Sequence, residues 1–243
     1  MSKKIYLIII WAVTLVAIVA GCLMHFSGAF NLFGKYGPLV ENTVELSGDT
    51  LTGIDINCDC ADLYVKYGDK IEVTYKYPNG CTPEVKLEDG VLTVNQEMKK
   101  GFAINISGKN TYRLDVTIPR TAKLDDVTVN LDYGDLDIED LCCTSMIVNT
   151  SCGDVDVKNI EAESGDFSLD FGDFDLTNSM IDSVNAKCDC GDLDVDVDAK
   201  YVDAFVDFGD VDVTTVDKNA KITVDYECGD ATVNGKKVKK NHD

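Results

Sequence analysis

The sequence is poor in the residues on which much enzyme chemistry and nucleic-acid recognition depend. It contains only two histidines, His25 and His242, and two arginines, Arg113 and Arg120. The single tryptophan, Trp11, stands in an apolar run near the N-terminus. Histidine is the commonest acid–base catalyst, and clustered basic side chains are needed to hold phosphates. The composition therefore argues against a histidine-dependent enzyme and against a nucleic-acid partner.

Positive charge is also scarce. The chain has 43 acidic residues against 22 lysines and arginines, which gives a net charge of −21 at pH 7 and a pI near 4.3. Such a charge repels polyanions, and it favours basic partners, bound cations or simply solubility in an exposed setting. The apolar fraction of 45% is that of a folded rather than a disordered chain.

The first 26 residues form a separate unit. Lys3 and Lys4 precede an uncharged run from Ile5 to Met24. A helix of about 20 residues spans about 30 Å, the thickness of the membrane's hydrocarbon core. The two lysines predict that the N-terminus lies inside and the rest outside. We expect residues 1–26 to be the transmembrane anchor of a single-pass cell-membrane protein, and residues 27–42 to be a juxtamembrane linker.

The anchor has one alternative. Residues 19–22 read Val-Ala-Gly-Cys, which resembles the bacterial lipoprotein processing box, in which the cysteine, here Cys22, is lipidated and becomes the new N-terminus. Leu23, Met24 and Phe26 continue the apolar run beyond the cleavage point, which favours an uncleaved helix. Both interpretations place the remaining chain at the outer face of a membrane.

A Gly-Asp pair recurs six times in the second half of the chain. The copies read YGDLDI, CGDVDV, FGDFDL, CGDLDV, FGDVDV and CGDATV. Their glycines follow one another at steps of 18 to 20 residues and are Gly134, Gly153, Gly172, Gly191, Gly209 and Gly229. A short fixed period is typical of stacked repeats, because a single unit is too small to bury its own apolar face.

Alignment on the glycine gives columns of apolar residues five and three positions before it and two and four positions after it. The column two positions after contains Leu136, Val155, Phe174, Leu193, Val211 and Ala231. Each repeat therefore reads as two short strands joined at a Gly-Asp corner, where glycine allows a sharp turn and aspartate bonds to its own backbone. We predict an all-β fold, a single parallel β-solenoid with coils of about 19 residues, over residues 43–238.

The residue before each glycine alternates between an aromatic ring and a cysteine. This column contains Tyr133, Cys152, Phe171, Cys190, Phe208 and Cys228. Alternating large and small side chains fill a narrow interior without voids, so we predict that the column faces the core.

The ten cysteines would normally suggest disulfides in an exported protein. Cysteines two coils apart, however, would lie about 9.6 Å from each other, beyond disulfide reach. The chain has no Cys-x-x-Cys pair, which gives zinc little support. We expect Cys58 with Cys60, and Cys188 with Cys190, on one inner face. The favoured interpretation is that the cysteines are small buried apolar residues. Structural disulfides and metal ligation are the alternatives.

The first half of the chain carries a less regular version of the repeat. CDCADLYV at residues 58–65 copies CDCGDLDV at residues 188–195, with Ala61 in the glycine position. The apolar alternation at residues 71–77 predicts the next strand, and residues 83–94 predict a hairpin, turning at Asp89-Gly90, that decorates the solenoid. The C-terminal GKKVKK is expected to close the last coil, leaving residues 239–243 as a basic tail.

The Gly-Asp coils, the strand that ends at Ile118-Pro119 before them and the short anchor resemble a family of bacterial membrane-anchored β-solenoids. Its members are classed as "putative adhesins" with a domain of unknown function, and the resemblance covers residues 44–238. It implies a cell-envelope protein, linked in some members to envelope-stress responses. It supplies no catalytic residues.

The strand alternation predicts outward-facing side chains two positions before, one after and three after each glycine. Most residues at these three positions are acidic. Calcium takes oxygen ligands, so carboxylates on adjacent coils could share one ion. The candidate calcium ligands are Asp135, Asp154, Asp173, Asp192, Asp210 and Asp230. The simpler alternative is that aspartate suits the corner and keeps a long β-rod soluble.

These features predict a non-catalytic surface protein, an adhesin-like binding or scaffolding module with an envelope or host-surface ligand and no cofactor other than calcium. The alternatives are a calcium-binding acidic solenoid and an envelope-stress accessory protein. A polysaccharide-processing β-helix enzyme is the least favoured, because equivalent acids repeat in every coil and no pair is singled out. Adhesion requires an exposed apolar patch. Tyr201 and Phe205 are the candidates, although Tyr201 fits the core better.

Overall fold

The computed structural model describes residues 38–47, 50–98 and 112–238. Every element in this part of the chain is a β-strand. None of the described residues forms a helix long and apolar enough to cross a membrane. The predicted anchor at residues 1–26, the lipidation candidate Cys22 and the tail at residues 239–243 lie outside the described residues. The first strand begins at Leu39, inside the segment predicted as a linker.

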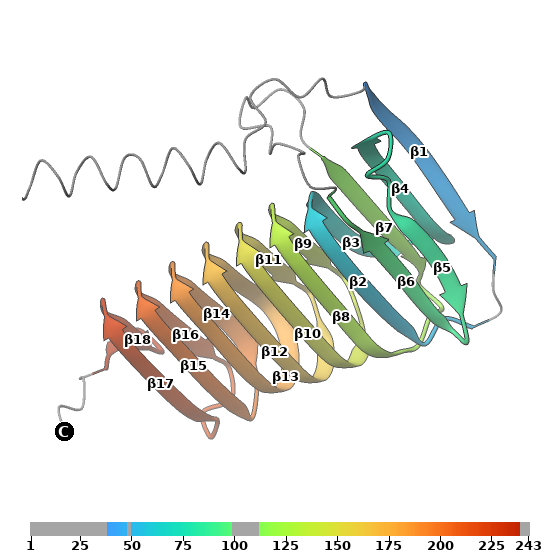
Figure 1. Ribbon diagram of the computed structural model, residues 1–243. Coiled ribbons are helices and arrows are strands. Elements are labelled where there is room, and N and C mark those ends of the chain that lie inside the picture. The colour runs from blue at the N-terminus through green and yellow to red at the C-terminus, as the bar shows by residue number, and fades with distance from the viewer. Residues whose placement is uncertain (1–37, 48–49, 99–111, 239–243) are drawn as a thin grey trace, which may run out of the picture.

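Six coils of two strands, joined at the Gly-Asp corners, form the regular part of the molecule and confirm the predicted solenoid (Figure 1). The first strands are β8 (Leu124–Tyr133), β10 (Cys143–Cys152), β12 (Glu161–Phe171), β15 (Tyr201–Phe208) and β17 (Lys221–Cys228). The second strands are β9 (Leu136–Glu139), β11 (Val155–Lys158), β14 (Leu193–Asp198), β16 (Val211–Thr215) and β18 (Ala231–Val233). One longer strand, β13 (Phe174–Cys190), runs from the second half of one coil into the first half of the next.

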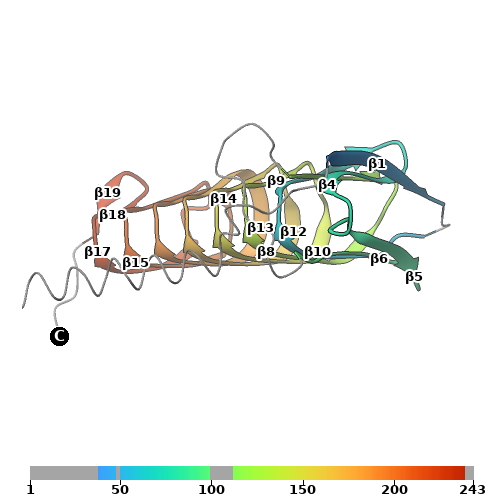
Figure 2. The ribbon, with the colours of Figure 1, turned by 45° about the horizontal axis from the view of Figure 1, so that its top comes forward.

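Each strand pairs in parallel with the equivalent strand one repeat along the chain. Val148, for example, lies opposite Val129 on one side and Phe167 on the other. The two sets of strands form two facing layers (Figure 2). The single 18-residue step is absorbed by a shift of register between Leu176 and Ser179, where β13 has one residue more than β14. The stack therefore keeps its corners aligned despite the missing residue.

The core lies between the two layers, and all four predicted apolar columns point into it in the five coils from β8 to β16. Phe167 and Phe174 face each other in one coil, fully buried, with ring centroids 4.9 Å apart. Gly165 makes room for them, because a Cβ at this position would lie 2.6 Å from the Phe167 ring. Within this coil, the absence of a side chain at Gly165 thus compensates for the volume of the two phenylalanine rings.

The N-terminal coils stack in an order that differs from their order in the chain. Strands β2 (Gly53–Cys60) and β3 (Asp62–Gly68) pair with β8 and β9 on one side. On the other side they pair with β6 (Val91–Gln96) and β7 (Arg113–Pro119). The CDCADLYV coil therefore adjoins the first Gly-Asp coil, and the later strands β6 and β7 lie outside it.

Antiparallel strands complete this end of the rod. β4 (Ile71–Pro78) lies between β7 and β1 (Leu39–Leu46), and β5 (Glu84–Glu88) forms the predicted hairpin with β6. Two expectations are corrected here. The solenoid is not parallel throughout, and the hairpin is no decoration, because β6 pairs with β2 inside the stack. The antiparallel strands cover backbone edges that a parallel stack would leave open.

The C-terminal end is closed by a short hairpin. β19 (Lys236–Lys237) turns back on β18 at Asn234-Gly235, and both turn residues have positive φ. Lys237 Nζ lies 2.8 Å from the carboxylate of Asp230. Lys236 and Lys237, the described lysines of GKKVKK, therefore cover the outer edge of β18, as predicted.

Candidate functional site

The Gly-Asp corners stack along one side of the rod, which we call the Gly-Asp edge and define as the residues from two before to three after each repeated glycine. The six glycines have φ between 124° and 152°. A Cβ on Gly153 would lie 2.0 Å from the carbonyl oxygen of Gly134, and the other corners are equally tight. Only glycine fits where one corner rests directly on the next.

The aspartate after each glycine bonds to the neighbouring coil. The Oδ1 atom of Asp173 accepts a hydrogen bond from the backbone N–H of Asp192 at 2.8 Å, and Asp192 does the same for Asp210. The ladder continues with donor–acceptor distances of 2.8–3.2 Å between Asp135, Asp154, Asp173, Asp192, Asp210 and Asp230. The prediction that each aspartate bonds to its own backbone is therefore wrong, because the stacked N–H groups lie within reach of the carboxylate one coil away.

Of the aspartates three positions after the glycines, Asp137 and Asp175 are half-buried, and the others are exposed. Burial raises the pKa of Asp137, Asp175 and Asp194 above the ordinary value of 3.8. The charges of carboxylates on adjacent coils, such as Asp156 beside both Asp137 and Asp175, raise these pKa values further. The edge thus holds charges that oppose each other in the folded state.

We expect acid and salt to stabilise this edge. A carboxyl with a raised pKa in the folded state favours folding when it is protonated, and that contribution is lost as the pH rises through the folded pKa. The melting temperature should therefore rise as the pH falls from 7 toward the raised pKa values of Asp137, Asp175 and Asp194. It should also rise at pH 7 with added sodium chloride, which screens the repulsion. A melting temperature that falls with added salt would contradict this account.

The column before the glycines faces solvent, which overturns the prediction that it fills the core. Tyr133, Phe171 and Phe208 are 47%, 59% and 57% exposed, and Cys152 and Cys228 are exposed as well. Strand alternation stops at the corner, where the residues two before, one before and one after the glycine are all exposed or half-buried. The residue two before each glycine drops out of the pairing between coils, so the strand alternation is interrupted before the glycine is reached.

Parallel pairing lines these side chains up in one row across seven coils. We call this row the exposed ladder; it contains Cys60, Tyr133, Cys152, Phe171, Cys190, Phe208 and Cys228. Aromatic rings and thiols alternate along it. A sequence signal for its outward direction was present, because aspartates flank the column on both sides at most corners.

The nine described cysteines are free thiols in this structure. Only four are buried, Cys58, Cys81, Cys143 and Cys188. The prediction that Cys58 and Cys60 share an inner face holds in part, because Cys58 is buried and Cys60 packs half-buried against the same core. It is wrong for Cys188 and Cys190, because Cys188 is buried whereas Cys190 is only half-buried at the corner and does not belong to the core. Burial raises the pKa of Cys58 and Cys188 to about 11, so these thiols stay protonated and unreactive.

The six candidate calcium ligands lie in one exposed column. Five of them give one carboxylate oxygen to the hydrogen-bonded ladder, and Asp230 pairs with Lys237. Among the described residues, no group of three or more histidine, cysteine or acidic side chains is arranged to hold a metal ion. Calcium binding stays a prediction.

The two aromatic residues proposed for adhesion lie away from the ladder. Tyr201 is 51% exposed, so its assignment to the core is wrong, and Phe205 is half-buried. Lysines of the chain lie over both rings, Lys221 Nζ at 5.5 Å from the Tyr201 centroid and Lys187 Nζ at 5.8 Å from that of Phe205. These rings are therefore already partly covered by cations of the same chain.

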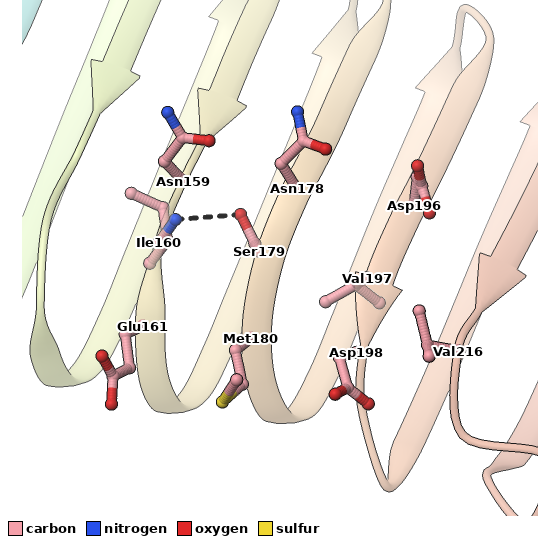
Figure 3. A pocket seen from close by; sticks show the side chains of 10 residues that line it. All are labelled: Asn159, Ile160, Glu161, Asn178, Ser179, Met180, Asp196, Val197, Asp198 and Val216. Carbon is pink, nitrogen blue, oxygen red and sulfur yellow. Dashed lines mark hydrogen bonds between the residues drawn. The ribbon is translucent and has the colours of Figure 1, made fainter.

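A shallow groove follows the turns after the second strands, where the register shift falls (Figure 3). Its volume is about 510 Å³, and its lining residues are Asn159, Ile160, Glu161, Asn178, Ser179, Met180, Asp196, Val197, Asp198 and Val216. Ser179 Oγ accepts a hydrogen bond from the Ile160 N–H at 3.0 Å. Met180 and Val216 are exposed beside the acids. Sequence reasoning missed this groove because it depends on the pairing of β13 with β14.

Known proteins resemble this chain in fold. A "putative adhesin" from Bacteroides fragilis is 16% identical, with a TM-score of 0.52 over 80% of this chain and 95% of that one. A "putative cell adhesion protein" from Clostridium sporogenes is 13% identical, with a TM-score of 0.42 over 80% and 97%. A "putative lipid binding protein" from Parabacteroides distasonis is 12% identical, with a TM-score of 0.35 over 81% and 96%.

No curated protein matches the chain. One protein-family model, described as Toastrack DUF4097, matches residues 51–241. This range contains all six Gly-Asp coils and the CDCADLYV coil stacked on them. The anticipated relationship is confirmed: the chain belongs to the Toastrack DUF4097 family.

Proposed function

We propose that this protein is a non-catalytic, adhesin-like binding module of the cell envelope, and that its rod presents the exposed ladder to a partner. The observation that carries the proposal is the row formed by Tyr133, Phe171 and Phe208, each about half exposed or more. Exposed apolar groups that gather in one place mark interaction sites more often than scattered ones do. The description of the Bacteroides fragilis structure as a "putative adhesin" supports the same role.

The arrangement of the acids supports binding rather than catalysis. Paired carboxylates act as acid and base only when their surroundings separate their pKa values. Here Asp137, Asp175 and Asp194 occupy equivalent positions, and their pKa values are raised for the same reasons. This repetition suits a scaffold, and it leaves a polysaccharide-processing enzyme as the least favoured alternative.

We further propose that residues 1–26 anchor the rod to the outer face of the membrane, with lipidation of Cys22 as the alternative. The intact mass of the protein isolated from membranes separates the two. An uncleaved anchor keeps the mass of the full chain, whereas lipidation removes the residues before Cys22 and adds acyl groups. The alternative function for a rod anchored at the outer face of the membrane is that of an envelope-stress accessory protein.

Capture from envelopes tests the binding role. Full-length protein in detergent is incubated with solubilised envelope material, and retained components are compared between wild type and the Phe171→Ser/Phe208→Ser variant. We expect the variant to lose the retained components. The matched control is Met180→Ser/Val216→Ser, which removes exposed apolar groups from the groove instead of the ladder. Equal capture by wild type and the ladder variant would sink the proposal.

Calcium binding at the Gly-Asp edge is the second proposal, supported by the column of stacked aspartates. Titration of calcium into the full-length protein is expected to give heat and to raise the melting temperature. Asp173→Asn/Asp192→Asn should reduce both effects, because it removes two neighbouring charges of the column. A titration without heat, together with an unchanged melting temperature, would show that the protein does not bind calcium.

A further inference from the structure

We propose that the exposed ladder binds a basic polyproline II segment of a partner protein. The inference rests on the proposed function and names the chemistry of the ligand. Three features of the ladder lead to it: the spacing of the rings, the carboxylates around them and the absence of cations over them.

The spacing of the rings suits a helix with three residues per turn. Tyr133, Phe171 and Phe208 occupy alternate coils, with one cysteine between each pair. Strands in a stack are about 4.8 Å apart, so successive rings lie about 9.6 Å apart. A polyproline II helix advances about 9.3 Å per turn of three residues and therefore presents every third side chain to the same face at nearly this interval. A β-strand would turn its third residue to the opposite face.

The surroundings of the rings favour a positively charged ligand. Phe171 stands between Asp170 and Asp173, and all three are exposed. Asp207, which is half-buried, and Asp210, which is exposed, flank Phe208. A lysine or arginine side chain placed over such a ring gains a cation–π contact and lies close to two carboxylates. The net charge of −21 disfavours a second copy of this chain as the occupant, because the two rods would repel each other.

Other rings of the chain already show this mode of contact. The guanidinium of Arg113 lies 4.5 Å from the centroid of Tyr64, and that of Arg120 lies 5.5 Å from Tyr67. Lysines lie over Tyr201 and Phe205. In the described part of the chain, no lysine or arginine lies over the rings of Tyr133, Phe171 or Phe208. The ladder is thus the row of rings left open for cations from outside.

A short peptide segment is long enough to contact all three rings. Three rings extend over about 19 Å, which about seven residues of polyproline II cover at 3.1 Å per residue. A basic residue at every third position places one cation over each ring, and the cysteines between the rings leave room for the intervening side chains. Proline-rich segments are extended before they bind, so little conformational entropy is lost.

Fluorescence anisotropy with labelled peptides tests the proposal on the full-length protein in detergent. The probe has about four Pro-Pro-Lys repeats. Two peptides of equal length serve as comparisons, one with the same composition but lysines at alternate positions, the other with glutamate in place of lysine. We expect the probe to bind at least about tenfold more tightly than the rearranged peptide, and the glutamate peptide not to bind.

Variants locate the site. Phe171→Ser/Phe208→Ser should weaken binding of the probe by about tenfold or more, whereas Met180→Ser/Val216→Ser should leave it unchanged. Equal affinity for the two lysine peptides, or equal affinity of wild type and the ladder variant, would overturn the proposal, since attraction to an acidic rod would then suffice. If the probe fails to bind while envelope capture still requires Phe171 and Phe208, the binding role stands and the ligand chemistry is wrong. If capture is also independent of the rings, both proposals fail.

Discussion

The Gly172→Ala variant is expected to lose on the order of 4 kcal/mol of folding free energy, a loss large enough to unfold a marginally stable protein. A Cβ at this position would lie 2.1 Å from the carbonyl oxygen of Gly153, and the clashing atom belongs to the backbone of the neighbouring coil. Gly172 also has φ +137°, a backbone conformation that residues with a side chain rarely adopt. Relief of the clash requires two corners to separate, and that breaks hydrogen bonds between coils.

Chemical denaturation followed by far-ultraviolet circular dichroism measures this loss. Tryptophan fluorescence is unsuitable, because Trp11 lies outside the β-domain. Gly235→Ala is the matched control: its φ is also positive, at +70°, but no atom lies within 4 Å of the added Cβ. It should cost only about 1 kcal/mol, the penalty of the backbone conformation alone. Similar losses in the two variants would show that contact between the corners is not what selects glycine.

The Phe167→Ala variant is expected to lose about 3–5 kcal/mol, because it removes a fully buried ring and leaves a cavity in the core. Phe167 is fully buried, and its ring contacts that of Phe174. Gly165, which leaves space for the ring, cannot fill the cavity that alanine creates. The flanking coils fix the strands on both sides and limit collapse.

Phe171 provides the control in the same coil, four residues later. It is 59% exposed, so Phe171→Ala should change the folding free energy by no more than about 0.5 kcal/mol. The comparison uses the same denaturation assay and the same pair of residue types. If Phe171→Ala cost as much as Phe167→Ala, the ladder would be part of the core, and both the binding role and its ligand would lose their basis.

Most of the regular fold could be predicted from the columns. The residues at positions such as Val129, Leu131, Leu136 and Ile138 alternate with polar ones, and each is buried as expected. The period of the glycines gave the coil length, and the likeness of CDCADLYV to CDCGDLDV identified a further coil of the same kind. These inferences succeeded because each depends only on local alternation and on repetition along the chain.

The candidate site was harder to predict. The aspartates of the Gly-Asp edge were placed outward correctly, but the ring column was assigned to the core, because alternation was continued from Leu169 to Phe171 without allowing for the turn. The hydrogen-bond partner of each aspartate was also missed. Both errors concern the corner, where the backbone leaves the strand conformation and where the nearest groups belong to another coil.

The sequence by itself determined that this chain forms stacked two-strand coils, because a 19-residue unit with apolar columns has no other way to bury them. It also determined that glycine occupies every tight corner of the six repeats. Only the tertiary structure decided which face the ring column takes, since the pairing between coils is interrupted at the residue just before this column and the strand alternation does not continue through it. It also decided that β6 and β7 stack outside β2 and β3, because strand pairing between distant segments, rather than order along the chain, sets which coils are neighbours.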